Sequence, residues 1–156
     1  MIRKTENELN KGFTLMELLV VIAILGLLAT VGLASFRSSQ IKGRDAQRKS
    51  DLSQIQKALE MYYNDTSFYP DSLGDGGESW EDDKGTLYMK EIPADPKGSN
   101  YCYENGGEGS WYRLYAKLEN SQDPGIEKSG CDGGCSCEGD NTYNYKVESQ
   151  NVPVIN

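Results

Sequence analysis

The sequence predicts an α+β protein in which one long N-terminal helix packs on a small C-terminal antiparallel sheet. Two observations predict this fold class. The chain has no proline between Phe13 and Pro70, and short segments of alternating apolar and polar residues appear only beyond that span. An uncharged apolar run from Leu18 to Phe36 also divides the 156-residue chain into a hydrophobic N-terminal part and a polar remainder. The low mean hydropathy of the whole chain, -0.62, conceals this division.

The first half of the predicted helix is long enough to span a membrane. As a helix, residues 13–36 would be about 36 Å long, since each residue adds about 1.5 Å. The hydrocarbon core of a bilayer is about 30 Å thick. A cleaved secretory signal fits poorly, because the apolar run is too long and no Ala-x-Ala site follows it. We therefore predict a transmembrane helix over 13–36.

One charged residue interrupts the apolar segment. Glu17 lies one helical turn into it, and no Lys or Arg within the segment is available to neutralise the carboxylate. A carboxylate inside a membrane is costly unless it is paired, and such residues are usually functional. We therefore expect Glu17 to have a functional role and a cationic partner from outside the segment.

The run from Lys11 to Gly26, KGFTLMELLVVIAILG, resembles the processing signal of type IV prepilins and type II secretion pseudopilins. The resemblance implies the pilin fold, cleavage after Gly12 by a membrane aspartic prepilin peptidase, and N-methylation of Phe13, so that 1–12 form a leader. It also supplies the missing cation. In that family the carboxylate at the position of Glu17 pairs with the free amino group of a neighbouring subunit's first residue during assembly, and such pairing is strong at low dielectric constant.

The helix is expected to continue beyond the membrane. Leu52, Ile55, Leu59 and Tyr62 fall on one helical face, while Asp51 and three other polar residues fall off it. We therefore expect an amphipathic segment over 37–63 that packs on a soluble head domain, 64–156. The basic residues between Arg37 and Lys57 have two open interpretations: they contact anionic lipid headgroups, or they form a solvated helix face.

The predicted head is acidic and contains short strands. From Glu60 to the C-terminus there are 19 acidic and 7 basic residues, which argues against binding to nucleic acid. Strands are predicted at 100–104 and 111–118, with a third alternation around Tyr143, Tyr145 and Val147. The acidic, Gly-rich segment 71–85 is predicted to be a solvated loop. A Pro-Ala-Asp-Pro turn at 93–96, followed by Tyr-Cys-Tyr, is similar to the corresponding region of major pseudopilins.

The four cysteines allow two interpretations. Cys102 stands alone, whereas Cys131, Cys135 and Cys137 form a C-x3-C-x-C cluster. Four thiolates could hold a structural zinc, but a small head outside the cytoplasm favours two disulfides. Of the three possible pairings, Cys135 with Cys137 is the least expected, because the intervening chain is so short. We expect Cys102 to tie the C-terminal loop to the hairpin.

No cofactor is expected, although the resemblance makes calcium a weak possibility. Major pseudopilins bind calcium in a C-terminal loop, so the resemblance makes four residues of the corresponding loop weak candidate ligands. They are Asp132, Glu138, Asp140 and Asn141. The alternative is an ordinary polar turn.

These observations predict a structural filament subunit rather than an enzyme. The chain has no histidine, no G-x-S-x-G nucleophile motif and no phosphate-binding glycine loop. The resemblance implies self-association into a helical filament, together with a prepilin peptidase/methyltransferase, an assembly platform and the membrane as partners. It implies a single-pass inner-membrane protein with its head outside the cytoplasm, and later a periplasmic or extracellular filament. The sequence does not distinguish a pilus subunit from a pseudopilus subunit. The alternative to a filament subunit is a membrane-tethered binding module that does not polymerise.

Overall fold

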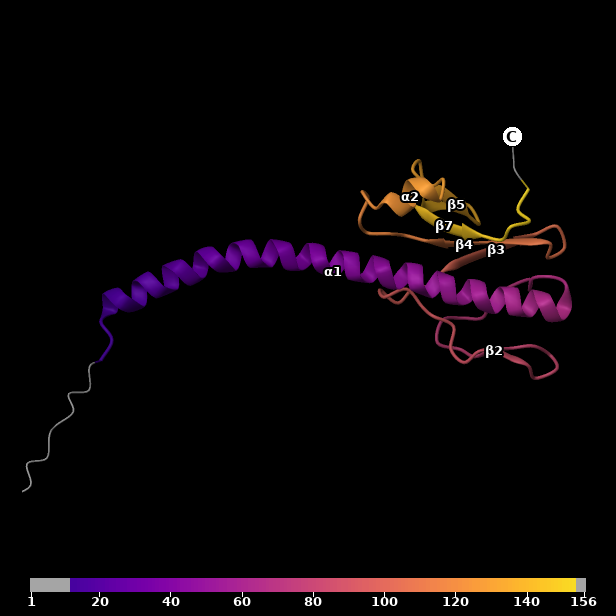
Figure 1. Cartoon of the computed structure of the whole chain (residues 1–156), viewed down its shortest axis with the longest axis horizontal. Helices are drawn as coiled ribbons and strands as arrows, with labels where there is room; N and C mark the ends of the chain where they lie inside the picture. The colour runs from indigo at the N-terminus through magenta and orange to yellow at the C-terminus, as the bar shows by residue number, and fades with distance from the viewer. Residues whose placement is uncertain (1–11, 154–156) are drawn as a thin grey trace, which may run out of the picture. The chain divides into compact units, whose positions relative to one another are not determined.

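The computed structural model describes residues 12–153, with only the backbone described at 31–34. The chain divides into two compact units, Met1–Ser39 and Gln40–Asn156. One 52-residue helix, α1 (Leu15–Thr66), begins in the first unit and continues into the second (Figure 1). The helix was predicted to break at Asn64, but it continues to Thr66. Ser67 then adopts a positive φ of 69°, and the Thr66 hydroxyl donates to the carbonyl of Tyr62, which together end the helix.

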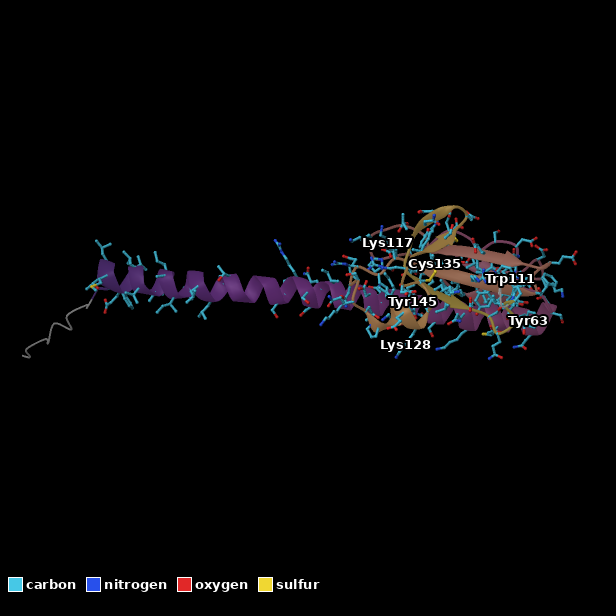
Figure 2. All side chains as sticks on the ribbon, turned by 90° about the horizontal axis from the view of Figure 1, so that it is seen from above. Tyr63, Trp111, Lys117, Lys128, Cys135 and Tyr145 are labelled. Atoms are coloured by element: carbon cyan, nitrogen blue, oxygen red, sulfur yellow. A yellow bond between two sulfur atoms is a disulfide. The ribbon has the colours of Figure 1, made fainter. Side chains whose placement is uncertain are left out.

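The first half of α1 contacts no other element among the described residues of its unit. Its large apolar side chains are exposed and radiate from the helix (Figure 2). By length and composition, α1 is long and apolar enough to cross a membrane. This exposure is what a helix requires if lipid or other copies of the chain are to surround it.

The main sheet has three antiparallel strands in the order β3-β4-β7. Strand β3 (Cys102–Gly106) pairs with β4 (Trp111–Ala116), and β4 pairs with β7 (Tyr145–Glu148). Figure 1 shows these strands alongside the second half of α1. The predicted α+β fold class is confirmed, although β3 begins two residues later than expected and β4 ends two residues earlier.

Two short hairpins and a short helix were not predicted. Strands β1 (Trp80–Glu81) and β2 (Leu87–Met89) form one hairpin, and β5 (Cys135–Cys137) and β6 (Asp140–Tyr143) form the other. Helix α2 (Pro124–Lys128) lies between β4 and β5 in the sequence.

The prediction of a solvated loop over 71–85 is therefore partly wrong. Trp80 is buried and its ring stacks on Tyr62 of α1, with centroids 5.4 Å apart. Tyr88 packs edge-on against the same ring at 5.2 Å. Each aromatic side chain buries a large apolar area, so these contacts hold the β1–β2 hairpin on the helix despite its acidic surroundings.

The core lies between the second half of α1 and the main sheet. The predicted helical face is confirmed: Leu52, Ile55 and Leu59 are fully buried and Tyr62 is partly buried. The sheet contributes residues that alternate along β4. They are Tyr112, Leu114 and Ala116. The apolar face of the helix and the apolar face of the strand thus pack together in one layer.

Two residues depart from the predicted burial. Asp51 was placed off the apolar face, yet it is buried, and the hydroxyl of Tyr101 donates to it at 2.8 Å, which offsets part of the cost of burying a carboxylate. Tyr115 alternates with the core residues Leu114 and Ala116 along β4, a spacing that predicts the opposite, outer face, yet only 3% of it is exposed. Its hydroxyl donates to Glu104 at 2.8 Å and its ring lies 5.9 Å from that of Tyr143 in β6, so the second hairpin covers this side of the sheet.

Candidate functional site

The N-terminal end of α1 holds three of the predicted site residues. Gly12 and Phe13 precede the helix, and the Phe13 side chain is 89% exposed. Residues 1–11 of the predicted leader lie outside the described residues. Phe13, Met16, Val20 and the Glu17 side chain line a shallow, mostly apolar groove of about 480 Å³.

Thr14 and Glu17 form a capping box that the sequence analysis missed. The Glu17 backbone N–H donates to the Thr14 hydroxyl oxygen at 3.2 Å, and the Thr14 backbone N–H donates to Glu17 Oε2 at 2.9 Å. The Thr14 hydroxyl also donates to the same Oε2 at 3.0 Å. This arrangement satisfies N–H groups that a helix start otherwise leaves unpaired. The T-x-x-E spacing at 14–17 was the signal that could have revealed it.

The Glu17 carboxylate therefore has neutral donors within its own chain. These hydrogen bonds leave its charge uncompensated, since neither donor is a cation. Glu17 Oε2 accepts both of the bonds from Thr14, so the other oxygen, Oε1, has capacity for a further donor.

The head contains two disulfides. Cys102 is bonded to Cys137, 35 residues away, and Cys131 is bonded to Cys135, four residues away. The first bond joins β3 to β5, and the second closes the tight turn before β5. Of the three possible pairings, the sequence disfavoured the one with a Cys135–Cys137 bond, and the observed pairing is one of the other two. With all four sulfurs in disulfides, the alternative of a four-thiolate zinc site is excluded in this state.

The weak calcium candidates are not gathered into a metal site. Asp132, Glu138, Asp140 and Asn141 are all exposed, and the Asp140 side chain accepts the backbone N–H of Thr142. Over residues 12–153, no three acidic, cysteine or histidine side chains converge closely enough to hold a metal ion. Asp132 and Glu138 lie in turns, whereas Asp140 and Asn141 belong to strand β6.

A buried ion-pair cluster joins α1 to the head. Arg48, only 2% exposed, donates to Asp95 of the 93–96 turn at 2.5 and 3.0 Å. It also donates to Asp45, one turn earlier on α1, at 2.8 Å and to Glu119 after β4 at 2.9 Å. Asp45 in turn accepts the backbone N–H groups of Glu119 and Asn120, both at 2.9 Å. A buried charge is tolerated only with such partners.

Further cations of α1 complete this cluster. Arg44 donates two hydrogen bonds to Glu119 at 2.7 and 2.6 Å, and Lys49 contacts Asp123 at 2.5 Å. The hydrogen bonds from Arg44, reinforced by those from Arg48, hold the pKa of Glu119 well below its usual range, although burial opposes this. Neither interpretation of the basic segment holds for Arg44, Arg48 and Lys49, because their partners are carboxylates of the head. Sequence reasoning missed these pairs because their partners lie 47 to 75 residues away.

Comparison with known proteins places these features in a family. A model of the prokaryotic N-terminal methylation motif matches residues 9–33. A model of type II secretion system protein G matches residues 36–130, more than half of the chain. The chain belongs to the type II secretion protein G family. The resemblance to pseudopilins inferred from the processing signal is thereby confirmed.

Individual relatives agree with this assignment. The chain is 35% identical to the type II secretion system core protein G of Escherichia coli over 115 residues, covering 67% of this chain and 78% of the relative. It is 31% identical to the Vibrio cholerae protein of the same name over 133 residues, covering 79% and 89%. It is also 30% identical to the type IV major pilin PilA of Myxococcus xanthus over 88 residues, covering 56% and 39%. No solved structure matches the chain significantly.

The family establishes the general function of this protein G homologue. The methylation motif, the protein G domain and the pilin relative together identify a structural subunit of a type IV pilus-like filament. The apolar first half of α1 is the segment that would anchor such a subunit in a membrane.

Proposed function

We propose that the protein is a pseudopilin of a type II secretion filament. The protein G model extends over most of the head, whereas the pilin relative is matched over only 39% of its own length. In this proposal residues 1–12 are a leader, 13–36 cross the membrane, 37–63 continue the helix and 64–156 form the head. The observation that carries it is the union of a processing motif and a protein G domain in one chain.

Processing creates the assembly site. Cleavage after Gly12 by a prepilin peptidase leaves Phe13 as the first residue, with a free amino group that becomes methylated. The Glu17 carboxylate of another copy is the acceptor for this amino group, because its only intrachain partners among the described residues are the neutral donors of Thr14. An ammonium–carboxylate pair is strengthened by the low dielectric constant of the surrounding apolar helices, so it fixes the register of neighbouring subunits.

The head remains outside the cytoplasm. Its two disulfides are typical of proteins in oxidising compartments, and its acidic surface keeps it in water. The subunit starts as a single-pass protein of the inner membrane and enters a periplasmic filament through an assembly platform. It acts as a structural element and not as an enzyme.

The first experiment is intact-mass and N-terminal peptide analysis of the protein from its native host. We expect a mature N-terminus at N-methylated Phe13 in the filament fraction. A Gly12→Val variant is the matched control and should retain Met1 and remain in the membrane fraction. An intact Met1 in the unaltered protein, found only in membranes, would contradict the proposal and favour a tethered module that does not polymerise.

A further inference from the structure

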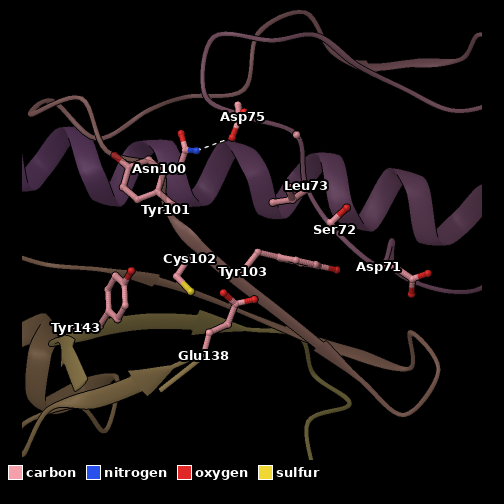
Figure 3. Close-up of a pocket in the computed structure, with 11 residues that line it drawn as sticks. Asp71, Ser72, Leu73, Asp75, Asn100, Tyr101, Cys102, Tyr103, Glu138 and Tyr143 are labelled. Carbon is pink, nitrogen blue, oxygen red and sulfur yellow. Dashed lines mark hydrogen bonds between the residues drawn. The ribbon is translucent and has the colours of Figure 1, made fainter. Parts of the chain in front are cut away.

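A pocket of about 330 Å³ opens beside β3, one of the two edge strands of the main sheet. One wall is the segment 71–75, and the opposite wall is the β5–β6 hairpin, as Figure 3 shows. Three tyrosines (Tyr101, Tyr103, Tyr143) and three carboxylates (Asp71, Asp75, Glu138) line it, and no Lys or Arg is among its lining residues. We call it the tyrosine–carboxylate pocket.

Two of the three tyrosines have hydroxyls that are engaged outside the pocket. The Tyr101 hydroxyl donates to Asp51 at 2.8 Å, and the Tyr103 hydroxyl donates to the carbonyl of Pro70 at 2.7 Å. With these hydroxyls committed elsewhere, the aromatic surfaces are what remains available to a ligand. Aromatic faces attract cations through their quadrupole, and the gain increases when the cation is desolvated.

The carboxylates retain unused acceptor capacity. Asp75 accepts one hydrogen bond from Asn100 at 2.7 Å, drawn as a dashed line in Figure 3. Asp71 accepts one from Asn105 at 3.3 Å. Within residues 12–153, no hydrogen bond or ion pair engages the Glu138 carboxylate. Each carboxylate can accept several donors, so the pocket suits a cation that carries N–H groups.

The pocket is held open in advance. The Cys102–Cys137 disulfide fixes the residue before Glu138 to β3, and the Glu138 backbone N–H donates to Glu104 at 3.0 Å. The opposite wall is attached through Asn100, which bonds both Asp75 and the backbone of Gly76. A preformed site binds more tightly, because little conformational entropy is lost when it is filled.

We propose that the tyrosine–carboxylate pocket receives a lysine ammonium from a second copy of the chain in the filament. The inference rests on the proposed function and deepens it. Six exposed lysines of the second unit have no carboxylate within ion-pair distance in the described part of the chain. They are Lys42, Lys57, Lys84, Lys90, Lys117 and Lys128.

Charge complementarity favours a copy of the chain as the partner. The sequence from Glu60 onward has a net charge of -12, so neighbouring heads repel unless a cation from one offsets the carboxylates of the next. A lysine on one surface and a pocket on another form a heterologous contact, which is the kind that propagates along a helical filament.

The test measures the reactivity of each lysine in isolated filaments. We expect one of the six lysines to be protected from acetylation, and a carbodiimide to link it to Glu138, Asp75 or Asp71 in a species with the mobility of a dimer. In the double variant Asp75→Asn and Glu138→Gln, we expect acetylation of that lysine to become about tenfold faster. Glu127→Gln, which alters an exposed carboxylate of α2 outside the pocket, should leave the rate unchanged.

The possible failures are distinguishable. Wild-type filaments without a protected lysine, or with equal acetylation in the double variant, would overturn the pocket contact alone. A wild-type protein that forms no filament would overturn the proposed function and the contact together. Retention of both disulfides and of the aromatic near-ultraviolet circular dichroism in the double variant verifies that its head is folded.

Discussion

The two halves of α1 have the same secondary structure and opposite environments. Among the described side chains of residues 15–39, no large apolar one is buried, whereas residues 40–66 bury a row of leucine and isoleucine together with a charged cluster. The first half has its apolar residues all around the helix, and the second has them on one face. A helix that is hydrophobic all round needs lipid or other helices as its solvent, while a striped helix needs only its own domain.

Charges follow the same division. In the first half, Glu17 is held by Thr14 and has no cationic partner among the described residues, and in the proposed filament its charge pairs with another chain. In the second half, Asp45 and Arg48 are buried and fully engaged by the head. In the proposed filament the first half therefore serves contacts between subunits, while the second half serves contacts within one. Substitutions in each half should separate assembly from folding.

The largest effect is expected for Glu17. Glu17→Ala should reduce filaments to background while leaving the protein in the membrane, because the acceptor for the neighbouring amino group is lost. Electron microscopy of sheared fractions and membrane immunoblots measure the two outcomes. Glu17→Gln is the matched control for charge, since it keeps an acceptor for Thr14. Abundant normal filaments from either variant would refute the ionic role.

Removal of Arg48 should destabilise the head most. Arg48→Ala leaves Asp45, Asp95 and Glu119 without their shared cation, at a cost of about 4 kcal/mol in the free energy of unfolding. Arg44→Ala, which removes a more exposed partner of Glu119, should have a much smaller effect. Denaturant titration of the full chain in micelles, followed by tyrosine and tryptophan signals, provides the comparison. Equal losses for the two variants would mean that burial does not set the importance of Arg48.

A cavity in the apolar layer should lower the free energy of unfolding by less than the loss of Arg48 does. Leu59→Ala is expected to lower the free energy of unfolding by about 3 kcal/mol, because Leu59 is fully buried between α1 and the sheet. Met61→Ala, two residues away and 55% exposed, should change it by less than about 0.5 kcal/mol. The same denaturant titration applies. If Met61→Ala were as damaging as Leu59→Ala, the assignment of the buried face would be wrong.

The smallest effect is expected from acid, which should lower the stability of the head by weakening its ion pairs with α1. The hydrogen bonds from Arg44 to Glu119 and from Lys49 to Asp123 lower both pKa values. At Asp95, burial opposes the hydrogen bonds of Arg48, but the net pKa is still lowered. Groups with lowered pKa values stabilise the fold above their unfolded values near 4, and this contribution is lost as the pH falls through the folded values.

Among the described carboxylates with a shifted pKa, Asp51 alone opposes this trend. Burial raises its pKa despite the hydrogen bond from Tyr101, so protonation of Asp51 favours the fold as the pH falls. We expect the Tm of the head to fall by about 5 °C between pH 6 and pH 3. The Arg48→Ala variant should show a smaller decrease, since its carboxylates have lost their cation. A Tm that rises on acidification would show that Asp51 outweighs the cluster.

The sequence by itself determined the features that depend on local pattern. The apolar run, the single carboxylate at Glu17 and the buried face of Leu52, Ile55 and Leu59 follow from spacing along one helix. The period-2 alternation in the segment 111–118 likewise located β4. Such patterns are readable because neighbouring residues in one element share a face.

Tertiary structure alone decided what joins distant segments. It chose Cys137 as the partner of Cys102, brought Asp95 and Glu119 to Arg48, and covered Tyr115 with the second hairpin. A charged residue on a helix looks the same in sequence whether water or a carboxylate 71 residues away satisfies it. The physical reason is that pairing energy depends on distance in space and on exclusion of water, and neither is set until the chain has folded.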